Sequence, residues 1–331
     1  MRNINPKLRL NLSNVILFFL FSTHALFYFS YSYIPVKWQI YTPVLLLIPF
    51  VVNKEKFYPL KKVDIVFFVW ILYSFFLFSI SLEKHYLNFV SGIISTYLIT
   101  KTRYDYDKVL LASGLLVLLV LVYNNLIPSY DYVSQFRDVN SKFGANRVSF
   151  ILFCFAVAFF SNYKIIGYIT FLLMSLYTSR LNIIGAIIYL LFRNKIIKNL
   201  LFFSFAILAA IIFFEPWMFE HYLFKVDYSI INRSERYLEY FDSSLANYLM
   251  PIMNFKVGPH SLFFELLIFY GFPILIFFTF FFYFSTRKFE FFIFLVFAVS
   301  AKQINDLGFF YLFLAWFFLS PFHNNYSTKY R

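Results

Sequence analysis

Cysteine, charged residues and metal-binding patterns are scarce in this chain, and each scarcity excludes a class of function. The single cysteine, Cys154, cannot form an intrachain disulfide, and inside an apolar run it is expected to be a small packed residue. No paired cysteines and no His-x-x-x-His sequence suggest zinc. No Gly-x-x-x-x-Gly-Lys loop suggests ATP-driven work. We therefore expect neither a metal nor a cofactor.

Charged residues make up only 14% of the chain, against 61% hydrophobic residues and 52 phenylalanines. A water-soluble domain of 331 residues cannot bury that much apolar surface. A helix that crosses a bilayer needs roughly 20 apolar residues, and many runs here approach that length. The composition predicts an all-α, polytopic membrane protein. The net charge of +13 then indicates basic cytoplasmic loops rather than binding to nucleic acid.

About twelve transmembrane helices are predicted from the lengths of the apolar runs. They cover residues 12–33, 39–53, 63–82, 86–100, 108–128, 147–161, 164–178, 181–192, 199–214, 260–284, 289–302 and 305–320. The first run is long for a signal-peptide core and has no clear cleavage site, so we expect it to remain as a span. No internal repeat is visible, which predicts one integral membrane domain over residues 1–331.

The basic residues predict an orientation for these spans. With a cytoplasmic N-terminus and alternating spans, most of the 29 basic residues fall on the cytoplasmic side, as the positive-inside rule requires. These are Arg2, Lys7, Arg9, Lys54, Lys56, Lys61, Lys62, Lys101, Arg103, Lys108, Lys164, Arg193, Lys195, Lys198, Arg287, Lys288, Lys329 and Arg331. Both termini are then cytoplasmic.

Two polar stretches fall on the outer side in this arrangement. The first covers residues 129–146, and the second is a large loop over residues 215–258. Within the loop, residues 229–249 carry apolar side chains at helical spacing and predict an amphipathic helix near the membrane surface.

Arginines on the outer side are unexpected in this topology, because the positive-inside rule predicts few of them there. Arg147 begins the sixth span, and Arg180 lies in the tight hairpin between the seventh and eighth spans. Arg233 and Arg236 lie three residues apart in the large loop, where one helical face could present both. Guanidinium groups bind phosphate oxygens through paired hydrogen bonds, although an arginine near a membrane can also reach lipid headgroups.

His260 is the candidate base. It stands with Ser261 at the start of an apolar run, directly after the large loop. A neutral imidazole, with a pKa of about 6.5, accepts a proton at neutral pH. The alternative is a histidine that only caps the helix or lies at the membrane interface. Glu265 follows one helical turn later, where a carboxylate can orient an acceptor, pair with an arginine or fill a packing defect. His24, inside the first span, is expected to be a hydrogen-bonded residue of the bundle.

Around His260 the chain resembles the O-antigen polymerase and O-antigen ligase superfamily of bacterial membrane glycosyltransferases. That family has, after a large periplasmic loop, His, then Asn, Ser or Gln, nine residues, Gly, two residues and Gly. In this chain His260, Ser261 and Gly271 match, and Ile274 replaces the final glycine.

Two further patterns carry the same resemblance. The large loop contains Arg-Ser-Glu at residues 233–235 and Gly-Pro immediately before the histidine, and the short hairpin contains Ser-Arg at residues 179–180. The motif covers part of the loop and the following span, and the twelve-span layout extends the similarity less specifically to the whole chain.

The resemblance implies a C-type glycosyltransferase-like fold in a bacterial inner membrane, with the site facing the periplasm. Such enzymes transfer a glycan from undecaprenyl pyrophosphate to an acceptor hydroxyl, with inversion and without metal. Arg180 and one or both of Arg233 and Arg236 would hold the pyrophosphate, and His260 would take or orient the acceptor proton. The possible supporting or acceptor-binding residues are Arg147, Ser261 and Glu265.

The resemblance leaves several functions open. A polymerase would join lipid-linked repeat units into a surface polysaccharide, either O-antigen or capsule, and the missing final glycine favours it. A ligase would move finished polymer to lipid A-core. A flippase would show two similar halves, and a purely structural subunit leaves the arginines and histidine unexplained. The expected partners are the undecaprenyl-pyrophosphate-linked glycan, membrane lipid and a chain-length regulator protein, with no nucleic acid.

Overall fold

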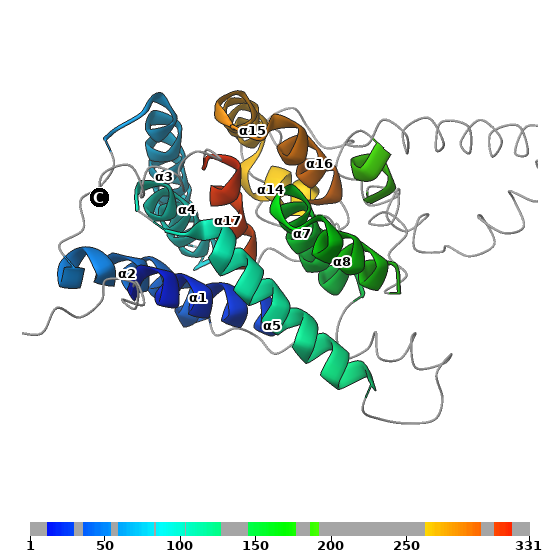
Figure 1. The fold of residues 1–331 in the computed structure, drawn as a ribbon. Helices are drawn as coiled ribbons and strands as arrows, with labels where there is room; N and C mark the ends of the chain where they lie inside the picture. Colours follow the sequence, from blue (N-terminus) through cyan, green and yellow to red (C-terminus); the bar gives the residue numbers. More distant parts are fainter. Residues whose placement is uncertain are drawn as a thin grey trace, which may run out of the picture.

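The computed structural model describes residues 12–29, 36–53, 59–82, 84–102, 104–126, 145–176, 186–191, 262–298 and 308–319. Within these ranges the chain is helical and contains no strand (Figure 1). The predicted all-α class is therefore confirmed for this part of the chain. The predicted span 199–214, the large loop 215–258 and the amphipathic helix 229–249 lie outside the described residues.

The helices begin and end close to the predicted spans, because both follow the lengths of the apolar runs. They are α1 (Leu12–Phe29), α2 (Val36–Asn53), α3 (Lys62–Ser81), α4 (Lys84–Lys101), α5 (Tyr106–Leu126), α7 (Ala145–Asn162), α8 (Lys164–Leu176), α14 (Leu262–Tyr270), α15 (Pro273–Phe284), α16 (Lys288–Ala298), α17 (Gly308–Leu314) and the 3-10 turn η4 (Ala315–Phe317). The predicted span 181–192 is described only over residues 186–191, which are helical.

By length and composition, α3 is the one helix in the described ranges that could cross a bilayer alone. It has 20 residues and a mean hydropathy of 2.2. Its exposed face carries large apolar side chains, among them Ile65, Phe68, Leu72 and Phe76, which is typical of a surface in contact with lipid. Shorter apolar stretches of 10–17 residues occur in α1, α2, α7, α8, α15 and α17 with η4. Association with a membrane is supported to this extent, and the count of twelve spans stays a prediction.

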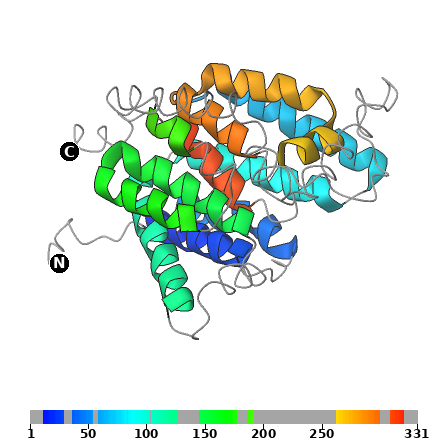
Figure 2. The ribbon, with the colours of Figure 1, turned by 90° about the vertical axis from the view of Figure 1, so that its right-hand side faces the viewer.

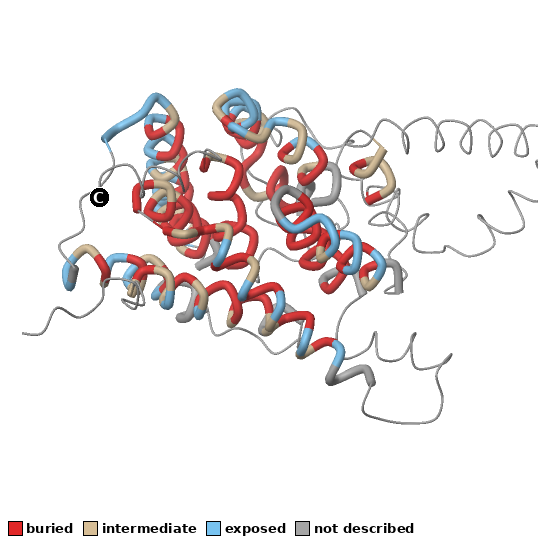
Figure 3. The backbone as a smooth tube through the Cα atoms, in the orientation of Figure 1, coloured by how far each residue is buried: buried red, intermediate tan, exposed pale blue. Residues whose placement is uncertain are grey.

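Helix α17 lies in the middle of the bundle, between α4 on one side and α7 and α16 on the other (Figures 1 and 2). Every residue of α17 and of η4 is buried, as the red colour of this segment shows (Figure 3). A helix that is apolar on all sides is stable in such a place, because no face of it requires water.

Glycines allow α17 to approach its neighbours closely. A methyl group added at Gly92 of α4 would overlap the Tyr311 ring, and one added at Gly308 would overlap the His24 ring of α1. Small residues serve this purpose between membrane helices. His24 is fully buried with Nε2 3.0 Å from Thr42 Oγ1, which confirms it as a hydrogen-bonded residue of the bundle. Cys154 is fully buried as well, as predicted.

Several helix ends that the topology assigns to the cytoplasm are joined by hydrogen bonds. The Asp105 amide donates to Asn14 Oδ1 at 2.9 Å, which joins the start of α5 to the start of α1. The Ser285 hydroxyl, after α15, donates to the Phe317 carbonyl at 3.0 Å, at the end of η4. These contacts agree with the alternating order of the helices. The side of the membrane on which this end lies stays a prediction.

Arg287 connects α15 to η4 at this end. Its Nη1 donates to the Trp316 carbonyl at 2.5 Å, and its guanidinium lies 4.1 Å from the centre of the Trp316 ring. Burial lowers the pKa of the Arg287 guanidinium, and the nearby Asp107 of α5 and Glu290 of α16 oppose that shift. Stacking on an indole favours arginine, whose flat group is weakly hydrated.

A buried ion pair joins the start of α3 to the end of α4. Lys101 Nζ lies 2.5 Å from Asp64 Oδ2, and both side chains are 3% exposed. Lys101 also donates to the Pro59 carbonyl at 3.0 Å, and the Lys61 amide donates to Asp64 Oδ2 at 2.5 Å. Buried charges require such additional hydrogen bonds, because removal from water costs several kcal/mol for each ion.

We predict that Lys101→Met destabilises the protein by about 3–5 kcal/mol, because it leaves the buried Asp64 carboxylate without its cation. Unfolding of the purified protein in detergent measures the change. Lys108→Met is the matched control, because Lys108 makes an ion pair with Asp105 at 2.5 Å and is 76% exposed. The control should change little. Equal losses in the two variants would mean that the Asp64–Lys101 pair is not buried.

Candidate functional site

Most of the predicted site residues lie outside the described residues. These are Arg180, Arg233, Arg236, His260 and Ser261. Arg147 belongs to the first turn of α7, and its side chain is not among those described. Glu265 is described in full. The convergence of the arginines and the histidine therefore stays a prediction, and the geometry of the site rests on the segment that directly follows Ser261.

That segment gives the motif spacing a structural meaning. The nine residues between Ser261 and Gly271 are the nine residues of α14 (Leu262–Tyr270). Gly271 has a φ of 63°, and its amide donates to the Leu267 carbonyl at 2.7 Å. This bond and this left-handed residue are a common way for a helix to end, and glycine adopts the conformation without strain. The spacing thus corresponds to one short helix and the glycine that ends it.

The predicted single span over residues 260–284 is divided in the structure into α14 and α15. The chain turns at Gly271 and Phe272, and α15 begins with Pro273. The apolar composition continues through the turn, so run length alone could not detect it. The Gly-x-Pro sequence was the available signal, because glycine permits the left-handed turn and proline has no amide hydrogen to continue the helix.

The two glycine positions of the motif, residues 271 and 274, differ in conformation. Gly271 requires the left-handed region, whereas Ile274 lies in the first turn of α15 and donates its amide to the Gly271 carbonyl at 3.2 Å. The Ile274 side chain is fully buried. The backbone at residue 274 therefore imposes no need for glycine, and the isoleucine side chain packs in the core.

Tyrosine hydroxyls donate hydrogen bonds to the carbonyls at the end of α14. Tyr73 of α3 donates to the Tyr270 carbonyl at 2.8 Å, and Tyr86 of α4 donates to the Phe269 carbonyl at 2.9 Å. A carbonyl left without a donor in an apolar interior costs on the order of 1–3 kcal/mol. Sequence reasoning missed both tyrosines, because nothing local distinguishes them from the other tyrosines of the chain.

The Tyr270 side chain fixes the same end of α14 by packing. It is fully buried and lies edge-on to Phe89 at 4.7 Å, to Tyr86 at 5.8 Å and to Trp70 at 6.0 Å between ring centres. The Ser74 hydroxyl lies 3.5 Å from the Tyr270 hydroxyl. Figure 2 shows α14 in yellow beside α3 and α4, from which these partners come.

Glu265 is only 5% exposed, in the first turn of α14. A carboxylate near the start of a helix is favoured by the positive end of the helix dipole. The next three residues, Leu266, Leu267 and Ile268, are buried as well. The described part of α14 is therefore enclosed by protein, and Glu265 lies inside the bundle on the helix that follows Ser261.

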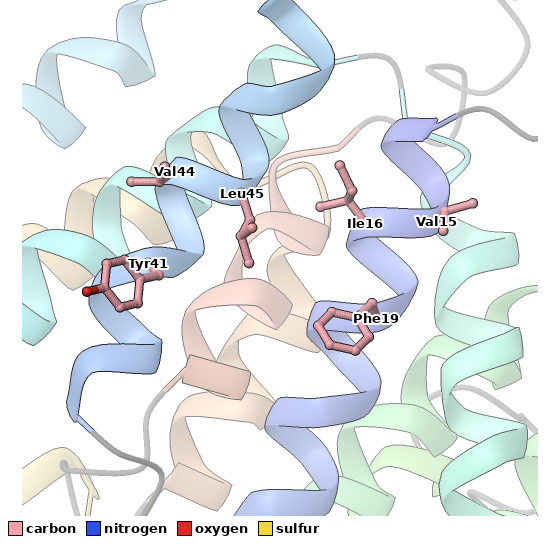
Figure 4. A pocket seen from close by; sticks show the side chains of 6 residues that line it. All are labelled: Val15, Ile16, Phe19, Tyr41, Val44 and Leu45. Carbon is pink, nitrogen blue, oxygen red and sulfur yellow. The ribbon is translucent and has the colours of Figure 1, made fainter. Parts of the chain in front are cut away.

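An apolar groove lies elsewhere, between α1 and α2 (Figure 4), with a volume of about 460 Å³. Its walls are the side chains of Val15, Ile16, Phe19, Tyr41, Val44 and Leu45. No group of three or more His, Cys, Asp and Glu side chains in the described ranges could hold a metal ion.

No protein-family model, curated protein or solved structure matches this chain. The similarity to the polymerase and ligase superfamily therefore rests on the sequence patterns at residues 179–180, 233–235 and 258–271, and the function drawn from it is a proposal.

We predict that Gly271→Ala destabilises the protein by about 1–2 kcal/mol, because a side chain disfavours the left-handed region. Gly271→Asn should cost less, because asparagine tolerates this region better than alanine does. Thermal unfolding of both variants in detergent measures the difference. If asparagine destabilises the protein more than alanine does, the cost comes from side-chain volume rather than from the backbone turn.

Proposed function

We propose that the chain is a polysaccharide polymerase of a bacterial inner membrane. It would join undecaprenyl-pyrophosphate-linked repeat units at the periplasmic face, with inversion and without metal. The observation that carries the proposal is the helix α14, whose nine residues fill the motif spacing between His260-Ser261 and the left-handed Gly271. In this arrangement the motif histidine stands two residues before the first residue of a short helix held inside the bundle.

The proposed chemistry is a single displacement. An acceptor hydroxyl oxygen attacks the anomeric carbon of the lipid-linked glycan, the bond from that carbon to the pyrophosphate oxygen breaks, and undecaprenyl pyrophosphate leaves. His260 takes the proton of the hydroxyl, since an imidazole with a pKa near neutrality is suited to that role. Attack from the side opposite the leaving group inverts the anomeric carbon.

The leaving group explains the predicted arginines. Negative charge develops on the pyrophosphate as the bond breaks, and cations already in place lower the barrier. Arg180, with Arg233 and Arg236, would supply these cations through paired hydrogen bonds to phosphate oxygens. Surroundings poor in water strengthen this attraction, because the effective dielectric constant falls.

The arrangement of α14 and α15 supports a site at the end of the bundle opposite the basic residues. Helix α15 runs from Pro273 to Phe284 and is followed by the turn at residues 285–287, which η4 contacts through Ser285 and Arg287. Its 12 residues span about 18 Å. His260 precedes α14 in the chain and would lie near the periplasmic face, whereas Arg287 would lie near the cytoplasmic face.

A ligase that transfers finished glycan to lipid A-core is the alternative, and it would use the same site. Ile274 favours the polymerase, because its buried side chain stands where the ligase pattern has glycine. A flippase is less favoured, because it would show two similar halves.

We predict that His260→Ala and Arg180→Ala each remove long polysaccharide chains. For His260→Ala the rate of polymerisation should fall roughly 10²–10⁴-fold, as expected for loss of a general base. Gel analysis of the surface polysaccharide, at equal amounts of membrane protein, gives the measurement. The matched controls are His323→Ala and Arg193→Ala, which change the same residue types on the predicted cytoplasmic side. Unchanged chain lengths in the two site variants would exclude the assigned site.

A strain that lacks the protein distinguishes the alternatives, through the same gel and through the sidedness of a labelled lipid-linked repeat unit. A lipid core that carries one repeat unit indicates a polymerase. A bare core with polymer retained on the undecaprenyl carrier indicates a ligase. A labelled repeat unit that never reaches the outer face indicates a flippase.

We also predict that a cysteine at Ser234 reacts with a membrane-impermeant maleimide in intact spheroplasts, because the large loop is assigned to the periplasm. Cys154→Ala supplies the background, and a cysteine at the exposed Lys164 is the control that should react only after permeabilisation. Labelling of the Lys164 position alone in intact spheroplasts would show that the predicted orientation is inverted, and it would exclude the proposed mechanism.

A further inference from the structure

The turn at Gly271 deprives two carbonyls of α14 of their helical donors. In a continuous helix the Phe269 carbonyl would accept from residue 273, but residue 273 is a proline and has no amide hydrogen. The Tyr270 carbonyl would accept from the Ile274 amide, which donates instead to the Gly271 carbonyl at 3.2 Å. Both carbonyls therefore depend on partners from other elements.

The partners are tyrosines from two different helices. Tyr86 of α4 donates to the Phe269 carbonyl at 2.9 Å, and Tyr73 of α3 donates to the Tyr270 carbonyl at 2.8 Å. Consecutive carbonyls of a helix lie about 100° apart around its axis, although all of them point along it. Two donors at these carbonyls thus restrain both the position of α14 along its axis and its rotation about that axis, which one donor would leave free.

This restraint acts at the end of α14 opposite His260. The helix extends about 12 Å from Tyr270 to Leu262, so a tilt of about 10° at its end would move its beginning by about 2 Å. A displacement of about 1 Å in a catalytic group can lower a rate on the order of 10²-fold. The two hydroxyl bonds therefore restrain the position of a base that comes shortly before Leu262.

We infer that Tyr73 and Tyr86 are positioning residues: their hydroxyls hold α14 at the angle that places His260 against the acceptor hydroxyl. This inference rests on the proposed function. The rings themselves contribute packing, since Tyr86 is 1% exposed and both rings contact Tyr270. Substitution by phenylalanine retains that packing and removes only the hydroxyl, so it separates position from core volume.

The test is Tyr73→Phe, Tyr86→Phe and the double variant, assayed with purified lipid-linked repeat units. We expect each single variant to lower kcat about 10-fold per folded molecule and the double variant about 10²-fold. KM for the lipid-linked unit should change less, because the arginines that hold its pyrophosphate are not on α14.

Tyr106→Phe is the matched control. The Tyr106 hydroxyl donates to the Leu312 carbonyl of α17, so the control loses the same kind of buried bond away from α14. It should lower the unfolding temperature and leave kcat per folded molecule unchanged. Wild-type kcat in the double variant, or an equal loss in Tyr106→Phe, would overturn the inference.

A second measurement does not depend on activity. In the Cys154→Ala background, Ser261→Cys reports the start of α14 through its rate of reaction with a maleimide. The rate should rise severalfold in the Tyr73→Phe and Tyr86→Phe double variant and stay unchanged in Tyr106→Phe. An unchanged rate in the double variant would overturn the positional role. A raised rate, with polymer unaffected even by His260→Ala, would support the restraint on α14 and overturn the proposed function.

Discussion

Main-chain carbonyls in an apolar bundle must find donors within the protein, and this requirement governs how the helices are joined. Where water is absent, an unpaired carbonyl costs several kcal/mol. Among the donors here are side-chain hydroxyls that reach from one element to a carbonyl of another. They belong to Tyr73, Tyr86, Thr96, Tyr106, Ser285 and Thr286. Hydroxyls suit the task because they are small, uncharged and able to rotate toward the acceptor.

The helices could be predicted from the sequence because the length and apolar character of a run are local properties. The apolar runs located α3 and α5 to within two residues, and His24 and Cys154 are buried as expected. The turn at Gly271 was missed, because hydrophobicity does not change there and only the backbone conformation does. The ion pair of Asp64 and Lys101 was missed for a different reason: it joins residues 37 apart in sequence, which no local pattern encodes.

The candidate site could be predicted only in part. The motif spacing between Ser261 and Gly271 coincides with one short helix and its terminal glycine, but the sequence had predicted a single continuous span there. The chain contains 27 tyrosines, so composition could not single out Tyr73 and Tyr86, whose role appears only when α3 and α4 are placed beside α14. Convergence of distant arginines is likewise a property of the tertiary arrangement, and it stays a prediction.

The central place of α17 has a consequence for biogenesis. This helix follows the other described helices along the chain, yet it packs on α1 and α4, which leave the ribosome long before it. Chains fold broadly from the N-terminus during synthesis. The earlier helices are therefore synthesised before the ring of Tyr311, which lies against Gly92 of α4, is available to cover it. Packing around α17 is then a late step of folding rather than a progressive one.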